Sequence, residues 1–107
     1  METNAKWPFD QAPNVAALTL RRILNGETQI LRVDHDIEDD SWMFLDGLEV
    51  SMDDTTLVRM QTIVNFDATV TEIAHMEPGK FATRQFVGDE WVICDQPMHL
   101  NDNDDSA

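Results

Sequence analysis

The stretch TQILRVDHDIEDDSWMFL, residues 28–45, decides the fold because it contains two apolar segments separated by a polar one. The first segment is TQILRVD (28–34), and the second, SWMFL (41–45), is strongly aromatic and apolar. Short runs of this composition are typical of β-strands. Residues 34–40 between them contain five carboxylates, which is typical of a solvated turn. The pattern predicts a β-hairpin with an acidic tip.

The segment before this hairpin predicts a strand that runs into a short helix. Residues 14–19 (NVAALT) are apolar and follow a proline, as expected of a short buried strand. Thr19 is a good capping residue for a helix over residues 20–24, whose leucines and isoleucine fall on one face. Gly26 supplies the stop signal.

The segment after the hairpin predicts two further helices and a second hairpin. Residues 47–54 have the composition of a loop. From Thr56 the apolar residues follow helical spacing; they are Leu57, Met60, Ile63 and Val64. Thr69 and Glu72 form the capping-box pattern that begins a second short helix. Residues 80–87 and 90–94, on either side of a Gly-Asp turn, predict the second hairpin.

This order of elements predicts a single α+β domain with a mainly antiparallel sheet and short helices packed on one face, because strands and helices do not alternate regularly. We expect residues 1–6 to be a flexible N-terminus, residues 7–97 to form the domain, and residues 98–107 to be an acidic disordered tail. The aromatic segment Trp7-Pro8-Phe9 is expected to pack back on the domain as an anchor.

Composition limits the classes of function and of partner. The chain has 107 residues with 42% hydrophobic residues, enough to form one core. Twenty-one acidic residues against seven basic ones give a net charge of −14. Such a charge repels nucleic acid and anionic membranes and attracts a basic protein. No signal-peptide pattern and no apolar run of about 18 residues is present, so we expect a cytoplasmic protein.

The single cysteine, Cys94, excludes an intramolecular disulfide and a thiolate metal cluster, and its apolar neighbours predict a buried structural thiol. The acidic segment fails as an EF-hand, because Asp39 replaces the required glycine and Leu45 the bidentate glutamate. A looser divalent-metal or small-ligand site remains an alternative. The histidines show no metal-site spacing; they are His35, His75 and His99. We expect no cofactor.

Catalysis by paired carboxylates is a further alternative. Asp34, Asp36 or Asp40 would need a shifted pKa, which usually requires burial, and the sequence contains no nucleophile motif or phosphate-binding glycine loop to support it. We expect no catalytic residues and no enzyme activity.

The remaining interpretation is a recognition surface, in which carboxylates on a rigid turn beside aromatic residues engage a basic protein. The expected partner-binding residues are Asp34, Asp36, Glu38, Asp39, Asp40 and Trp42. The structural alternative is that the acidic segment is only a solvated turn. The sequence therefore predicts a non-enzymatic protein-binding module.

Three stretches together resemble a family of small bacterial proteins, similar to immunity-type domains of polymorphic toxin systems. They are WPFDQAPNVAALTLRRILNGETQIL, HDIEDDSWMFLDG and VNFDATVTEIAHMEPGKFATRQFVGDEW. The resemblance implies an α+β cytoplasmic domain and, for the immunity branch, an inhibitor that binds and neutralises a cognate toxin. The family has an acidic turn that leads into an aromatic strand, with the motif Asp-Ser-Gly-Trp-x-Phe. Asp40, Trp42 and Phe44 match this acidic-turn motif, although Ser41 is followed directly by Trp42 without the intervening glycine.

Overall fold

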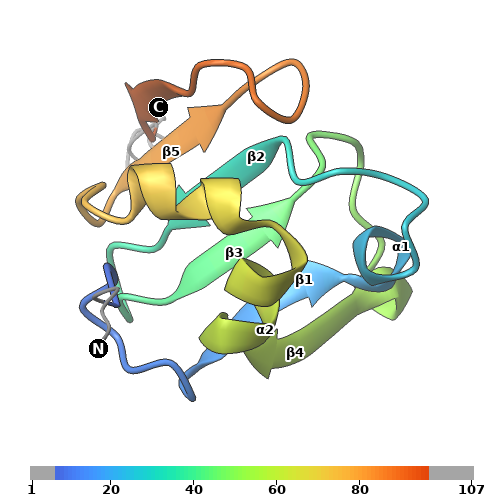
Figure 1. Ribbon diagram of the computed structural model, residues 1–107, viewed down its shortest axis with the longest axis horizontal. Coiled ribbons are helices and arrows are strands. Elements are labelled where there is room, and N and C mark those ends of the chain that lie inside the picture. Colours follow the sequence, from blue (N-terminus) through green and yellow to red (C-terminus); the bar gives the residue numbers. More distant parts are fainter. Residues whose placement is uncertain (1–6, 97–107) are drawn as a thin grey trace, which may run out of the picture.

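A six-stranded sheet forms the centre of the computed structural model, which describes residues 7–96 (Figure 1). The strand order is β4-β1-β3-β2-β5-β6, and every neighbouring pair is antiparallel except β1 and β3. The strands are β1 (Ala16–Leu20), β2 (Arg32–His35), β3 (Trp42–Leu45), β4 (Thr55–Arg59), β5 (Lys80–Thr83) and β6 (Val92–Asp95). The helices are α1 (Arg21–Leu24), η1 (Met52–Asp54), α2 (Met60–Phe66) and η2 (Ala68–Ile73). The α+β prediction with a mainly antiparallel sheet is confirmed.

Both predicted hairpins are present. The β2–β3 hairpin aligns Val33 with Phe44 and His35 with Trp42. The β5–β6 hairpin aligns Phe81 with Cys94. The β5–β6 connection is longer than the predicted Gly-Asp turn, because β5 ends at Thr83 rather than at residue 87, and Phe86 within the connection is 56% exposed.

The region predicted to be helical from Thr56 onward belongs to two elements, β4 and α2. Its first part is the edge strand β4, which pairs with β1 through the register Leu18 to Leu57, and only its second part is α2. Thr55, Thr56 and Val58 are β-branched residues that favour a strand. Leu57 is 67% exposed, so its helical spacing from Met60 was coincidental.

Both predicted helix caps are also wrong. The Thr19 hydroxyl donates to the Phe44 carbonyl oxygen at 2.8 Å instead of capping α1, which is one turn long. The cap of η2 is the Asp67 carboxylate, which accepts hydrogen bonds from the amide and hydroxyl of Thr69 at 3.0 and 2.5 Å.

The core lies between the sheet and the helices α2 and η2, which cross the same face of the sheet in Figure 1. Alternate strand residues point into it because successive side chains of a strand face opposite sides. Each large apolar side chain buried here contributes about 1.5–3 kcal/mol. The fully buried large residues are Trp42, Phe44, Leu20, Ile23, Ile30, Met60, Ile63, Ile73, Val33 and Val70.

The N-terminal anchor packs as expected. Phe9 is buried and meets Trp42 edge-on, with ring centroids 5.1 Å apart, and Trp7 lies against Phe9 at 5.6 Å. The anchor therefore closes the core at the end of the sheet where the β2–β3 connection lies.

The opposite face of the sheet carries a row of registered residues, one from each of the six strands: Leu57, Leu18, Met43, Asp34, Phe81 and Cys94. Most are partly exposed, and Cys94 is half-buried rather than fully buried. No described helix covers this face. The segments expected to be a flexible N-terminus and an acidic tail, as well as His99, lie outside the described residues.

Candidate functional site

The acidic segment forms a compact turn, residues 36–40, which we call the hairpin tip. The Asp36 amide donates to the Ser41 carbonyl at 2.9 Å, and the Asp40 amide to the Asp36 carbonyl at 3.1 Å. The Asp36 carboxylate accepts from the Glu38 amide at 2.7 Å. The Asp39 carboxylate accepts from the amide and hydroxyl of Ser41 at 3.1 and 2.7 Å. Two of the five carboxylates thus fold the turn, as short acidic side chains commonly do.

These local bonds favour the ionised form of Asp39. The hydroxyl and amide of Ser41 lower the pKa of Asp39 because both stabilise its ionised form. The side chains of Glu38, Asp39 and Asp40 are exposed, and Ile37 between them is 68% exposed. The tip therefore presents carboxylates around one apolar side chain.

His35 fixes the base of the tip. Its ring is buried at 5% exposure and stacks on the Trp42 indole with centroids 3.9 Å apart and planes at 15°. The Nδ1 atom lies 2.7 Å from the Met76 carbonyl oxygen, and Nε2 lies 2.7 Å from Oδ1 of Asp40. Although Asp34 and Asp36 flank His35 in the sequence, the strand register turns its side chain toward the core.

Gln11 ties the N-terminal anchor to the same place. Its Nε2 donates to the carbonyl and to Oδ2 of Asp40, both at 2.9 Å, and its Oε1 accepts from Nε1 of Trp42 at 2.8 Å. Its own carbonyl accepts from Nε1 of Trp7 at 2.6 Å. Asp40 is held from two sides and has φ of 61°, in the left-handed region that L-residues rarely adopt.

Two predicted contact residues are not at the surface. Asp34 is 6% exposed on the opposite sheet face, where both its oxygens accept from Arg32 at 2.7 and 3.0 Å and one also accepts from Gln96 at 2.9 Å. Trp42 is 1% exposed in the core. Neither is available to a partner, so the structure restricts the candidate contact set to Asp36, Glu38, Asp39 and Asp40.

A hollow of about 600 Å³ adjoins the tip. Four carboxylates reach it from three parts of the chain; they are Asp10, Glu38, Asp40 and Glu77. His35 and His75 also line it, and none of the described residues that line it is a lysine or arginine. This hollow could not be predicted from the sequence, because Asp10 and Glu77 are brought beside the tip only by the fold.

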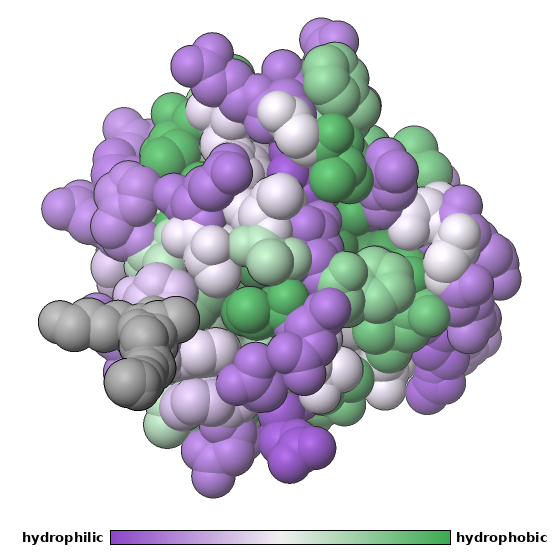
Figure 2. Space-filling model, in the orientation of Figure 1, coloured by the Kyte–Doolittle hydropathy of each residue, from purple (hydrophilic) through white to green (hydrophobic). Residues whose placement is uncertain are grey.

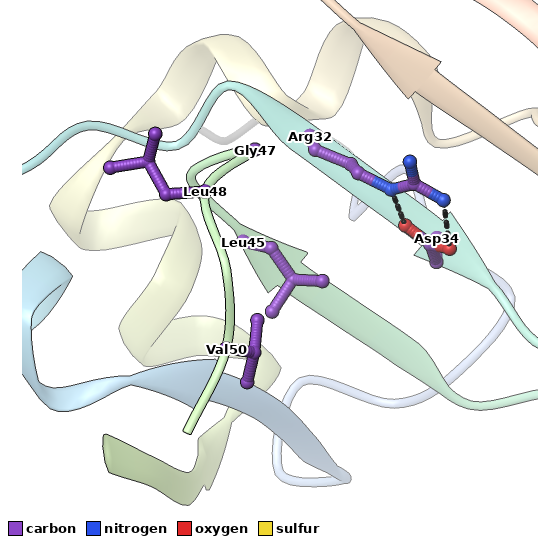
Figure 3. A pocket seen from close by; sticks show the side chains of 6 residues that line it. All are labelled: Arg32, Asp34, Leu45, Gly47, Leu48 and Val50. Atoms are coloured by element: carbon purple, nitrogen blue, oxygen red, sulfur yellow. Dashed lines mark hydrogen bonds and ion pairs between the residues drawn. The ribbon is translucent and has the colours of Figure 1, made fainter. Parts of the chain in front are cut away.

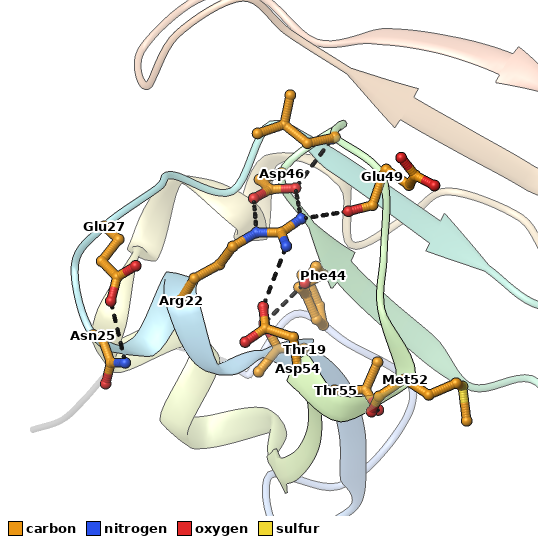
Figure 4. Close-up of polar contacts among 11 residues, drawn as sticks. Thr19, Arg22, Asn25, Glu27, Phe44, Asp46, Glu49, Met52, Asp54 and Thr55 are labelled. Atoms are coloured by element: carbon orange, nitrogen blue, oxygen red, sulfur yellow. Dashed lines mark hydrogen bonds and ion pairs between the residues drawn. The ribbon is translucent and has the colours of Figure 1, made fainter.

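A second polar cluster binds the β3–β4 connection to α1 (Figure 4). Arg22 donates to both oxygens of Asp46 at 2.6 and 3.0 Å and to the Glu49 carbonyl at 2.9 Å, and it lies 3.4 Å from Asp54. The Arg22 guanidinium lowers the pKa of the buried Asp46 to about 2. Arg22 is bound on several sides by this connection, so we assign the cluster a structural role.

The connection held by Arg22 borders a shallow depression of about 220 Å³ on the opposite sheet face (Figure 3). Leu45, Leu48 and Val50 surround it, and the Arg32–Asp34 pair forms its polar side. Arg32 and Asp34 neutralise each other, so the depression carries little net charge to attract a charged ligand.

The described residues show no arrangement specific to metal binding or to acid–base catalysis. Within residues 7–96, no three His, Cys, Asp or Glu side chains converge closely enough to hold a metal ion. The carboxyl pKa values that are clearly displaced, those of Asp39 and Asp46, are lowered, whereas a general acid needs a raised one.

Comparisons with protein-family models, with curated proteins and with solved structures found no match to this chain. Among residues 7–96, the longest helices are too short and too polar to cross a lipid bilayer. The resemblance to immunity-type domains therefore stays a prediction.

Proposed function

We propose that this chain is a protein-binding module that engages a basic partner through its hairpin tip. The observation that carries the proposal is the combination of exposure and rigidity at residues 36–40. The carboxylates of Glu38, Asp39 and Asp40 are exposed and that of Asp36 is partly exposed. The backbone beneath them is fixed by turn bonds, by His35 and by Gln11.

Rigidity matters because binding costs less free energy when the binding surface is already ordered. The hollow beside the tip supports a cationic partner, because Asp10 and Glu77 extend the acidic surface and no lining lysine or arginine opposes them. Charge complementarity of this kind speeds association and discriminates against acidic proteins. Ile37 adds an exposed apolar contact at the centre.

An immunity-like inhibitor is the specific form of this function that the family resemblance implies. In that form the tip would cover a basic functional surface of a toxin. The support is the match of Asp40, Trp42 and Phe44 to the acidic-turn motif, together with an exposed acidic tip. The divalent-metal alternative has less support, because the described carboxylates around the tip do not converge on one point.

The test compares two variants with equal charge loss. The tip variant carries Asp36→Asn, Glu38→Gln and Asp39→Asn, and it keeps the oxygen atoms that accept the turn bonds. The control variant carries Glu27→Gln, Glu72→Gln and Glu90→Gln, all at exposed positions distant in sequence from the tip. The wild type and both variants are immobilised and exposed to an extract of the source cells at low and high salt.

We expect the wild type and the control variant to retain the same basic protein in stoichiometric amount, and the tip variant to lose it. High salt should weaken retention, because exposed charges are screened within about 10 Å at 0.1 M ionic strength. Equal loss in both variants would show that only net charge matters, and retention by the tip variant would remove the tip from the interface. Circular dichroism spectra of all three proteins check that the fold is unchanged.

A further inference from the structure

We propose that His35 is a proton-dependent latch for the hairpin tip: as the imidazolium it holds Asp40, and on losing its proton it releases the tip. This proposal deepens the proposed function by adding its regulation, and it rests on that function only for the consequence for partner binding. The latch itself is a property of the free chain.

The positions of the hydrogen-bond acceptors carry the inference. One ring nitrogen faces the Met76 carbonyl oxygen and the other faces the Asp40 carboxylate, each at 2.7 Å. A carbonyl and an ionised carboxylate both accept and neither donates. Only the imidazolium has two N–H groups, so only the charged ring satisfies both contacts. A neutral ring satisfies one and places a lone pair against an oxygen at the other.

The contact that breaks is the one with Asp40. The Met76 carbonyl belongs to the backbone of a buried residue, and its contact with the ring is itself buried, away from water. The Asp40 side chain is 61% exposed and lies on the tip, so water can replace its bond to the ring at small cost. Deprotonation therefore frees the tip and leaves the core side of His35 in place.

Release of Asp40 loosens its backbone as well. A left-handed φ at an aspartate costs free energy and persists only when its surroundings hold it. His35 and Gln11 are the described side chains that bind the Asp40 carboxylate. With His35 gone as a donor, the amide of Gln11 alone restrains it.

Charged and aromatic groups from several elements surround the ring. Lys80 lies across from His35 in β5, but it is paired with Asp95. The Trp42 face beneath the ring attracts a cation. Charged or titratable groups near His35 on β2, the tip, the anchor and the segment after η2 are Arg32, Asp34, Asp36, Glu38, Asp40, Asp10, His75 and Glu77. Carboxylates predominate, and Arg32 is neutralised by Asp34.

The experiment is an NMR titration of the full free chain from pH 5 to pH 8.5, following the His35 ring carbons and the backbone amides of residues 37–40. We expect the ring and the tip amides to change with one common midpoint. Above that midpoint the heteronuclear NOE of the tip amides should fall, and the Asp40 side chain should gain motion.

Three variants separate the latch from a general pH effect. Asp40→Asn removes the ionised acceptor and should decouple the tip amides from the titration of the His35 ring. Glu38→Gln removes one charge from the same tip without touching the ring and should leave the coupling intact. His35→Gln should abolish the titration of the tip amides. Because that variant removes a buried ring, Asp40→Asn is the test if His35→Gln does not fold.

Tip amides that stay constant while the His35 ring titrates would overturn the latch, as would a ring that keeps one protonation state across the whole range. No partner is present in this experiment, so its failure leaves the binding proposal standing with a tip held by Gln11. Failure of the capture experiment would leave a working latch unaffected.

Discussion

The negative charge of Asp46 stabilises the folded state. Its carboxylate is buried, receives two hydrogen bonds from Arg22, and accepts the Leu48 amide at 3.1 Å. These bonds stabilise the ionised form and lower the pKa of Asp46 from 3.8 to about 2. Since the unfolded chain has the ordinary value, the pair stabilises the fold above pH 4 and loses this effect as the pH falls toward 2.

Asp46→Asn should lower the free energy of unfolding by about 2 kcal/mol at pH 7, the equivalent of the pKa shift. The difference from wild type should shrink between pH 4 and pH 2, where the wild-type carboxylate takes up its proton. Urea unfolding at pH 7, 4 and 2.5 measures it. The control Asp53→Asn, at an exposed site on the same connection, should show no such difference. If Asp46→Asn were destabilised by the same free energy at every pH, the ion pair would not be the source of the stabilisation.

Thr19 offers a second test at the level of one atom. Its buried hydroxyl donates to the Phe44 carbonyl and so links two parallel neighbours, β1 and β3. Thr19→Val should cost about 1–2 kcal/mol, because the shape is kept but a buried carbonyl loses a donor. Thr56→Val, directly across the β1–β4 pair, is the matched control and should change the unfolding free energy little. Equal effects of the two would assign the cost to strand propensity.

Among the elements, the C-terminal half is organised by Arg84, which follows β5. Its fully buried guanidinium donates to the Ile30 carbonyl at 3.1 and 2.9 Å, to Thr69 at 2.8 Å and to Asp67 at 2.8 Å. It also lies 4.1 Å from the centre of the Trp91 ring. The Arg84 side chain therefore links η2, the α1–β2 connection and the β5–β6 hairpin.

Arg84→Lys should destabilise the fold by about 2 kcal/mol or more, although the charge is kept, because an ammonium cannot reproduce the planar fork of donors. Denaturant unfolding followed by tryptophan emission measures the loss, and Trp91 should become more exposed. Arg21→Lys at an exposed site is the control and should stay within about 0.5 kcal/mol of wild type. If Arg84→Lys were as stable as the wild type, water would have to replace the hydrogen bonds that the guanidinium donates.

The elements also show how far the sequence predicts the structure. The two hairpins follow from local apolar runs and turns, and the structure has both. The β4 edge strand could not be read, because Leu57 matches a helical period by chance and pairing with β1 is a long-range property. For η2, the sequence pattern predicted Thr69 and Glu72 as the N-terminal cap, but the carboxylate of Asp67 caps the helix instead. In the site, the exposed tip was predicted, whereas the burial of Asp34, His35 and Trp42 depended on register.

At the scale of the whole molecule, charge is the dominant feature. The described lysines and arginines other than Arg21 and Arg59 are engaged in ion pairs with carboxylates. Unpaired carboxylates therefore cover much of the surface, and polar side chains separate the apolar patches on the helix-bearing face (Figure 2). A net charge of −14 on one small domain opposes the compact state through self-repulsion.

Salt should therefore stabilise the free protein. Raising NaCl from 10 to 300 mM should increase the melting temperature by roughly 4–8 °C, equivalent to about 1 kcal/mol for a domain of this size. Differential scanning calorimetry measures it. The variant Glu72→Gln with Glu90→Gln should melt higher at low salt and respond less. A fall in melting temperature with salt would show that the ion pairs outweigh the repulsion.

The strand order has a consequence for how the chain is made. Leu18 of β1 lies between Met43 of β3 and Leu57 of β4, and both neighbours are synthesised later than β1. As the nascent chain leaves the ribosome, β1 emerges with neither edge paired. The β2–β3 hairpin can close first from local contacts, and β1 then docks beside β3 before β4 completes its other side. During cotranslational folding, β1 should therefore stay unpaired until β3 and then β4 are available. Until residue 59 has emerged, at least one edge of β1 should be accessible to chaperones.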